Sequence, residues 1–262
     1  MLARSLVGSM VLVSALAYAD VPPVCGGNSA LLAWVDRPTI GDSACTVPNQ
    51  KVLLEIGYQY QALKTAGNGF QLPQTELRIG LPSQTEFVLL PMNYIHQSQN
   101  PRAGVAAAVV GLKHEVAYAS NWLATAEAIM TLPSGSRAYG SQSAGAAVNG
   151  IIAYSLNPVW SVSVMAGVSS QTLPVAVGGA RYNSFNPDVV ITAQLSPKVQ
   201  ALVEVYGQSR TAPHAGAGFN ADAGVLYLIT QNTDIDFELG QRISGNLGNF
   251  NHYIGVGLAT LL

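Results

Sequence analysis

The sequence predicts an all-β fold: a closed antiparallel transmembrane β-barrel of about 12 strands, preceded by an N-terminal signal peptide. Three observations predict it: apolar residues alternate with polar or small ones, connections alternate between short and long, and charge is scarce. Only 10% of the 262 residues are charged and 49% are hydrophobic, whereas about a quarter of an ordinary soluble domain is charged. Such a chain is too apolar to be disordered and too poor in charge to cover a soluble surface.

The charge balance argues against nucleic-acid binding. The chain has 12 Lys and Arg against 14 Asp and Glu, a formal net charge of −2, without a basic block. Neutralising phosphates requires clustered Lys and Arg, so no nucleic-acid partner is expected.

The first 19 residues have the three parts of a secretory signal peptide. Arg4 supplies the positive charge, residues 6–16 are apolar, and Ala17-Tyr18-Ala19 resembles a cleavage site. The apolar run is short for a membrane-spanning helix. Residues 1–19 are therefore expected to be removed on export.

Residues 20–50 are expected to form a periplasmic segment before the barrel. Cys25 and Cys45, the only cysteines, predict a disulfide in an oxidising compartment, whereas two thiols are at best half of a metal site. The segment either enters the lumen as a plug or stays at the periplasmic mouth. Its apolar Leu31, Leu32 and Trp34 require burial, against the barrel or against a hydrophobic ligand.

The barrel is expected over residues 51–262, where the alternation indicates strands with one apolar face. It recurs over residues 160–168, 199–206, 234–242 and 253–262. In the first strand, one face carries Val52, Leu54, Ile56, Tyr58 and Tyr60, and the other carries Glu55, Gly57, Gln59 and Gln61.

The connections between these strands give their number. Short turns are expected at residues 82–84, 119–121, 156–158, 196–198 and 230–232. Longer loops are expected near residues 61–69, 96–103, 133–144, 169–181, 207–218 and 243–251. Eleven connections join twelve strands, with the short turns at one end of the barrel and the long loops at the other.

Two strands have a weaker pattern. Apolar residues blur the alternation over residues 86–96, where Pro91 removes a ladder hydrogen bond, and residues 104–113 are apolar on both faces. One or both are expected to carry a bulge or to be covered inside.

The bilayer explains why such a sheet closes. Lipid offers no hydrogen bonds to an exposed strand edge, so the apolar face points outward and the polar face lines the lumen. The rival fold, a soluble β-sandwich or small barrel, needs more surface charge than this chain has. Arginine at Val203 or Phe237 is then expected to destabilise the protein, whereas arginine at Glu204 is expected to be tolerated.

An ordered series of short motifs runs through the exported chain. It begins with Asp36-Arg37-Pro38, Thr46-Val47-Pro48 and Leu54-Glu55-Ile56-Gly57-Tyr58, and continues with Leu72-Pro73-Gln74-Thr75-Glu76-Leu77-Arg78-Ile79-Gly80-Leu81, Gly111-Leu112-Lys113, Thr131-Leu132-Pro133-Ser134-Gly135, Val203-Glu204-Val205-Tyr206-Gly207, Asp222-Ala223-Gly224, Asp236 and Gly255-Val256-Gly257-Leu258. The series resembles a family of bacterial outer-membrane barrels labelled as transporters or as proteins of the MetA-pathway of phenol degradation. The resemblance implies transport of small solutes, including hydrophobic or aromatic ones. The chain departs from the family at Ala107, where an acidic residue is common, and at Leu262, where an aromatic residue is usual.

Alternation assigns much of the charge to the lumen. The set comprises Glu55, Glu76, Arg78, Lys113, Glu127, Glu204, Asp222, Asp236, Glu238 and Arg242, and the resemblance adds Glu86. One interpretation is a polar conduit or solute-binding interior whose acidic majority disfavours small anions. The other is a ladder of ion pairs that fills the barrel, with Arg78 on neighbouring carboxylates and Arg242 on Glu238 or Asp236.

No catalytic residues, metal site or cofactor are predicted. His96, His114, His214 and His252 lack the spacing of metal ligands. Trp122, Trp160 and Tyr227 lie beside expected short turns, where an aromatic girdle meets the membrane interface.

The sequence therefore predicts a channel or transporter for small solutes in the outer membrane of a Gram-negative bacterium. Its expected partners are outer-membrane lipid and the solute. The alternative is a membrane-embedded enzyme or a surface receptor that acts through the barrel rim and long loops.

Overall fold

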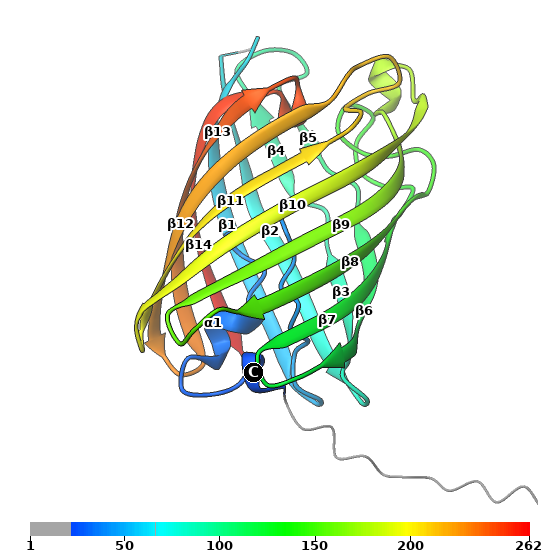
Figure 1. The fold of residues 1–262 in the computed structure, drawn as a ribbon. Helices are drawn as coiled ribbons and strands as arrows, with labels where there is room; N and C mark the ends of the chain where they lie inside the picture. Colours follow the sequence, from blue (N-terminus) through cyan, green and yellow to red (C-terminus); the bar gives the residue numbers. More distant parts are fainter. Residues whose placement is uncertain (1–21, 66) are drawn as a thin grey trace, which may run out of the picture.

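The computed structural model describes residues 22–65 and 67–262, which contain one antiparallel sheet closed on itself. The first strand, β1 (Val52–Leu63), pairs with β2 on one side and with the last strand, β14, on the other. The barrel seen in Figure 1 therefore has no free edge in this part of the wall. The signal peptide expected over residues 1–19 lies outside the described residues.

Fourteen segments of strand make up twelve strands of the barrel, because two strands are interrupted. β2 pairs with both β3 and β4, which are successive parts of one strand, and β5 and β6 are successive parts of the next. After β1 the segments are β2 (Asn68–Leu81), β3 (Thr85–Leu90), β4 (Tyr94–Gln97), β5 (Ala103–Val105), β6 (Val109–Tyr118), β7 (Trp122–Thr131), β8 (Gly145–Ser155), β9 (Trp160–Thr172), β10 (Arg181–Ser196), β11 (Val199–Gln208), β12 (Gly218–Thr230), β13 (Thr233–Ser244) and β14 (Phe250–Leu261).

The two interruptions lie side by side at the positions where the sequence pattern is weak. Pro91 has no N–H for the ladder, and the next strand breaks at residues 106–108. The N–H of Ala106 donates to Asn93 O across the two breaks, and that of Ala108 donates to Ser134 Oγ in the β7–β8 loop. Other hydrogen bonds thus replace the missing ladder, as buried backbone groups require.

The connections alternate in length around the barrel. Short turns, including residues 82–84 and 119–121, lie at the end that also holds α1 and the C-terminus, and the long loops lie at the opposite end (Figure 1). These are called the short-turn end and the long-loop end below.

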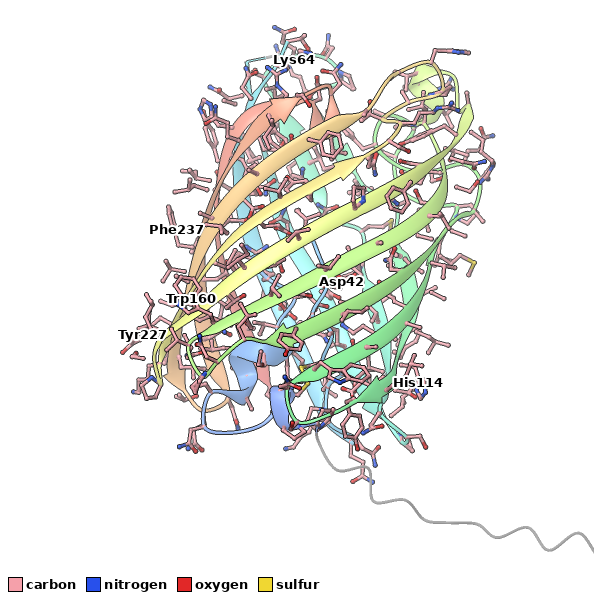
Figure 2. All side chains as sticks on the ribbon, in the orientation of Figure 1. Asp42, Lys64, His114, Trp160, Tyr227 and Phe237 are labelled. Carbon is pink, nitrogen blue, oxygen red and sulfur yellow. A yellow bond between two sulfur atoms is a disulfide. The ribbon has the colours of Figure 1, made fainter. Side chains whose placement is uncertain are left out.

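The two faces of the wall differ as the alternation predicts. Outward-facing Val203 and Phe237 are 52% and 49% exposed, whereas Glu204, between two outward-facing valines, is 1% exposed. The outer face is apolar and the charge lies inside, which suits a wall surrounded by lipid. Trp160 and Tyr227 point outward near the short-turn end, in the expected position for an aromatic girdle (Figure 2).

Residues 22–51 form the N-terminal segment, which enters the barrel from the short-turn end (Figure 1). It contains a 3-10 turn, η1 (Pro23–Cys25), and one short helix, α1 (Ala30–Trp34); two other 3-10 turns, η2 (Val175–Val177) and η3 (Leu247–Asn249), lie in long loops. No helix among the described residues is long and apolar enough to cross a membrane.

Candidate functional site: the lumen and the N-terminal segment

Two apolar clusters hold the N-terminal segment at the short-turn end. Leu31 and Leu32 of α1 are 1% and 4% exposed and pack against inward-facing wall residues, among them Leu53 and Leu202. Cys25 and Cys45 form a disulfide, whose cluster includes Leu123 and Ile151 of β7 and β8. The apolar residues of the segment are therefore buried against the barrel wall.

Arg78 on β2, which lies opposite Leu53 of the first cluster in the register, binds the segment to the wall. Its guanidinium lies 3.1 Å from Asp36, 3.4 Å from Glu55 and 2.9 Å from Glu86, with 0% of the side chain exposed. It also donates to the carbonyl oxygens of Trp34 and Cys45. One buried cation thus joins three carboxylates and two backbone carbonyls.

Lys113 on β6 extends this network. Its Nζ lies 3.0 Å from Glu86 and 3.5 Å from Asp36, and it donates to Ser43 O at 2.9 Å. Asp36 and Glu86 thus supply negative charge beside Lys113.

The segment also brings a cation of its own, Arg37, to the wall. Nη2 of Arg37 lies 3.1 Å from Asp236 and 3.5 Å from Glu238, both on β13. Glycines at inward-facing positions make room for it, since a Cβ at Gly57 or Gly257 would lie 2.3 or 2.2 Å from the guanidinium.

The wall of β10, β11 and β12 carries carboxylates without a nearby cation. Glu204 accepts hydrogen bonds from the backbone N–H groups of Ile40 and Gly41, the latter at 2.7 Å. Asp222, opposite Glu204 in the register, accepts from Tyr253 Oη at 2.8 Å. Asp188 is 3% exposed, and neither of its oxygens has a hydrogen-bond partner among the described residues.

Burial changes the acidity of the segment's own carboxyl groups. Burial, and next the Glu127 carboxylate, raise the pKa of Asp42 well above its usual value, against the opposing effect of Lys113. Burial also raises the pKa of Asp36, although Arg78 and Lys113 act in the other direction. Both groups are therefore easier to protonate in the lumen than in water.

One group of carboxylates has the spacing of metal ligands. Oxygens of Asp36, Glu55 and Glu76 lie within 4.8 Å of one another. The Arg78 guanidinium, however, already pairs with Asp36 and Glu55. The arrangement is thus an ion-pair network with its cation supplied by the wall.

A cavity of about 610 Å³ lies between the segment and the wall at the short-turn end. It extends from Ser29 and Pro158 near the mouth to Gly41 and Asp42 inside the barrel. Its wall is mixed in character, with polar Gln194 and apolar Leu202. The cavity can therefore accommodate a small solute of mixed polarity.

The structure brings most of the sequence-predicted lumen residues together. Buried and facing inward are Glu55, Arg78, Glu86, Lys113, Glu127, Glu204, Asp222, Asp236 and Glu238, with Glu76 partly buried beside them. Arg242 differs: it lies near the long-loop end and donates to Gly245 O and Asn251 Oδ1. The expected pairing of Arg242 with Glu238 or Asp236 is wrong, because Arg37 binds both carboxylates.

The expectation that arginine is tolerated at Glu204 also needs correction. Glu204 is 1% exposed and accepts three hydrogen bonds from the N–H groups of Ile40 and Gly41. An arginine there would lose these three bonds and would face N–H donors instead of open water. Alternation identifies the face of a residue but not what fills the space in front of it.

Sequence reasoning missed several lumen residues. Asp36 and Arg37 appeared only in a family motif, without a role. Glu115, Asp188 and Asp234 are 3%, 3% and 1% exposed and follow the same two-residue pattern as the predicted set. The alternation signal could have found these three, whereas nothing local in the sequence indicates which wall Arg37 binds.

The histidines lie apart from this network. His114 Nδ1 lies 2.9 Å from Thr85 Oγ1 on the neighbouring strand, and His96 stacks on Phe70 with ring centroids 4.9 Å apart.

Comparison with known proteins agrees with this architecture. A sequence model of the family described as "Putative MetA-pathway of phenol degradation" matches residues 35–259, which confirms the resemblance noted in the sequence. A search of the curated proteins found no match.

Three solved structures resemble the barrel at low sequence identity. An outer membrane channel from Pseudomonas putida F1 has a TM-score of 0.66 at 13% identity, covering 87% of this chain and 100% of that chain. The NanC porin has a TM-score of 0.55 at 9% identity and the KdgM porin 0.54 at 10%, covering 80% and 79% of this chain and 98% of each porin. The predicted fold class is thereby confirmed.

Proposed function

This chain belongs to the MetA-pathway of phenol degradation family, and from that premise we propose that it is a channel or transporter for small solutes in the outer membrane of a Gram-negative bacterium. One observation carries the proposal: a closed barrel whose outer face is apolar encloses a charged interior. Such a wall is stable in lipid, and such an interior suits the passage of a solute. The similar solved structures are named as a channel and as porins, which supports the same function.

The N-terminal segment acts as the plug of this channel. Arg78, Lys113 and Arg37 each join the segment to the wall by ion pairs, and apolar clusters pack the segment against the wall at the short-turn end. Passage of a solute then requires part of residues 36–47 to move. The plugged state predominates until a solute or another event displaces the segment, because displacement leaves buried charges of the wall without their partners.

The orientation and the solute class follow from the same premise. The short-turn end and the disulfide-linked segment face the periplasm, in keeping with the usual short periplasmic turns of such barrels. Hydrophobic or aromatic solutes are the proposed cargo, because the family description refers to phenol degradation and the cavity has a mixed lining.

Single-channel recording in a planar bilayer tests this function. The full exported chain is expected to be mostly silent, and Arg37→Gln is expected to produce discrete conductance steps that prefer cations. Liposomes that contain the variant should also take up phenol faster than protein-free liposomes. If the correctly folded variant gives neither conductance nor solute flux, the channel proposal is wrong.

The alternative, an enzyme or receptor at the rim, has no specific observation in its favour. An enzyme of the serine type needs a serine, a histidine and an acid in contact. Among residues 22–65 and 67–262, His114 is hydrogen-bonded to Thr85, and no histidine is hydrogen-bonded to a carboxylate.

A further inference from the structure

The charge of this protein is divided between its interior and its long-loop end. Of the 14 Asp and Glu residues, Asp20 lies outside the described residues, and the other 13 lie in the N-terminal segment or face the lumen. The six long loops contain no Asp or Glu at all. The long-loop end is thus without any acidic residue.

This same end carries exposed cations. Lys64, Arg102, Arg137 and Arg210 lie in or beside four of the long loops, and Arg181 is the first residue of β10. Figure 2 shows Lys64 at this end, far from α1. Like charges on one rim repel one another unless anions lie among them.

Three of these arginines belong to loops that contact one another. The Tyr139 hydroxyl donates to Pro101 O, next to Arg102, and the Ala176 N–H donates to Arg137 O at 3.0 Å. Arg181 donates to Ala144 O at 2.6 Å, at the end of the loop that contains Arg137. The loops after β4, β7 and β9 therefore form one connected surface, named here the arginine platform, of Arg102, Arg137 and Arg181.

The position of Arg181 indicates what this platform meets. Arg181 shares the outward face of β10 with Phe185 and Ile191, which are 49% and 42% exposed on the lipid side of the wall. Its guanidinium is held against this wall by Ser170 Oγ at 3.0 Å. It thus lies where the apolar band ends and lipid headgroups begin.

We propose that the arginine platform binds the phosphate groups of the glycolipid that surrounds the barrel in the outer leaflet, lipopolysaccharide. The inference rests on the proposed function, since it needs the long-loop end to face outward. Guanidinium groups bind phosphate through paired, charge-assisted hydrogen bonds, and the platform has no carboxylate to compete with it. Arg137 also borders a hollow of about 360 Å³ with a mixed lining that includes the hydroxyl-bearing Ser134 and Ser141, and this hollow can accept a phosphate.

The test compares phospholipid vesicles with and without lipid A, the diphosphorylated anchor of lipopolysaccharide. The variant Arg102→Gln/Arg137→Gln/Arg181→Gln removes the platform. The matched control Lys51→Gln/Lys198→Gln removes exposed cations from the short-turn end. The full exported chain is refolded in each vesicle, and lipid A binding is measured by displacement of a fluorescent lipid A.

Lipid A is expected to bind the wild type and the control equally. The triple variant is expected to bind it about 100-fold more weakly, from about one kcal/mol for each cation near an anionic headgroup. Added 1 M salt should reduce wild-type binding as well. Equal affinity of the triple variant and the wild type would overturn the proposal, as would equally strong competition by inorganic phosphate, which would mean a site for free anions.

The lipid A binding test and the conductance test can fail independently of each other. Conductance of the triple variant in phosphatidylcholine bilayers, combined with Arg37→Gln, should match that of Arg37→Gln alone. A channel that conducts but does not bind lipid A refutes the platform alone, and a protein that binds lipid A but never conducts refutes the channel alone.

Discussion

Arg37 Nη2 lies 3.1 Å from Asp236 Oδ1, an ion pair between residues 199 positions apart in the chain. The pair joins the N-terminal segment to β13, while Arg78 joins the same segment through Asp36 to β2, which is separated from β13 by β1 and β14. Ion pairs to two strands of the wall therefore hold the segment. The segment can move only if both sets of ion pairs break, or if one set breaks and the chain held by the other is long enough to be displaced.

Arg37→Gln weakens one attachment without changing any residue of the barrel wall. Removing this largely buried cation leaves Asp236 and Glu238 facing each other and weakens the plugged state by about 3 kcal/mol. Conductance in a planar bilayer should rise, with longer open times. The control Lys198→Gln, an exposed cation at the short-turn end, should conduct like the wild type.

Lipid-facing positions provide an independent test of the barrel. Val203→Arg or Phe237→Arg should lower the free energy of unfolding in lipid by about 2–4 kcal/mol near the bilayer midplane. Gln200→Arg, on the same strand as Val203 but facing the cavity, should cost much less. Urea unfolding of lipid-refolded protein measures the difference, and equal losses at positions 203 and 200 would argue against the assigned faces.

The fold was predictable from the sequence because each strand of a membrane barrel has its own local alternation of apolar and polar residues. Each strand alternates independently of the others, so Val203 and Glu204 reveal their faces without knowledge of their neighbours. Even the interruption near Pro91 was indicated locally by the proline and the blurred alternation, although the sequence did not distinguish a bulge from a break.

The arrangement inside the lumen was only partly predictable. Alternation places Glu55 and Asp236 inside, but the partner of each comes from the N-terminal segment, which has no repeating pattern. Arg37 and Arg242 have the same chemistry, and only the three-dimensional path of the segment decides which one binds Asp236. Long-range ion pairs of this kind leave no signal in a single sequence.

The plug should respond to pH through Asp42. Burial and the Glu127 carboxylate raise the pKa of Asp42 well above its usual value of 3.8, whereas the released segment regains that usual value. The docked segment thus binds the proton more tightly, so the contribution of Asp42 to docking is largest below pH 4 and is lost as the pH rises through the raised pKa. Conductance of the wild type should increase over this range.

Asp42→Asn should flatten this response, since the amide stays neutral at every pH. The measurement is open probability between pH 4 and pH 8 for both proteins. A wild-type open probability that falls as the pH rises, or a variant with an unchanged pH response, would refute a role for Asp42.

The carboxylates on β10 and β11 should set ion selectivity. Asp188 and Glu204 are buried, and neither forms an ion pair with a lysine or arginine among the described residues. Their carboxylates therefore favour the passage of cations once the segment moves. Asp188→Asn/Glu204→Gln, made together with Arg37→Gln, should reduce the potassium-to-chloride permeability ratio. Reversal potentials in a salt gradient measure it, and a ratio equal to that of Arg37→Gln alone would contradict the assignment.

The central claim is that the segment must move for the lumen to conduct, and a disulfide lock tests it most directly. A Cβ on Gly41 would lie 2.8 Å from Asp188 Cγ, which brings the two side chains within reach of a disulfide in Gly41→Cys/Asp188→Cys. The pair is made in a Cys25→Ser/Cys45→Ser background that also carries Arg37→Gln, the change expected to permit conductance. The single variants serve as controls. Conductance should be absent while the lock is oxidised and should appear in the same bilayer after dithiothreitol is added. Equal conductance before and after reduction, with the lock verified by mass spectrometry, would contradict the account.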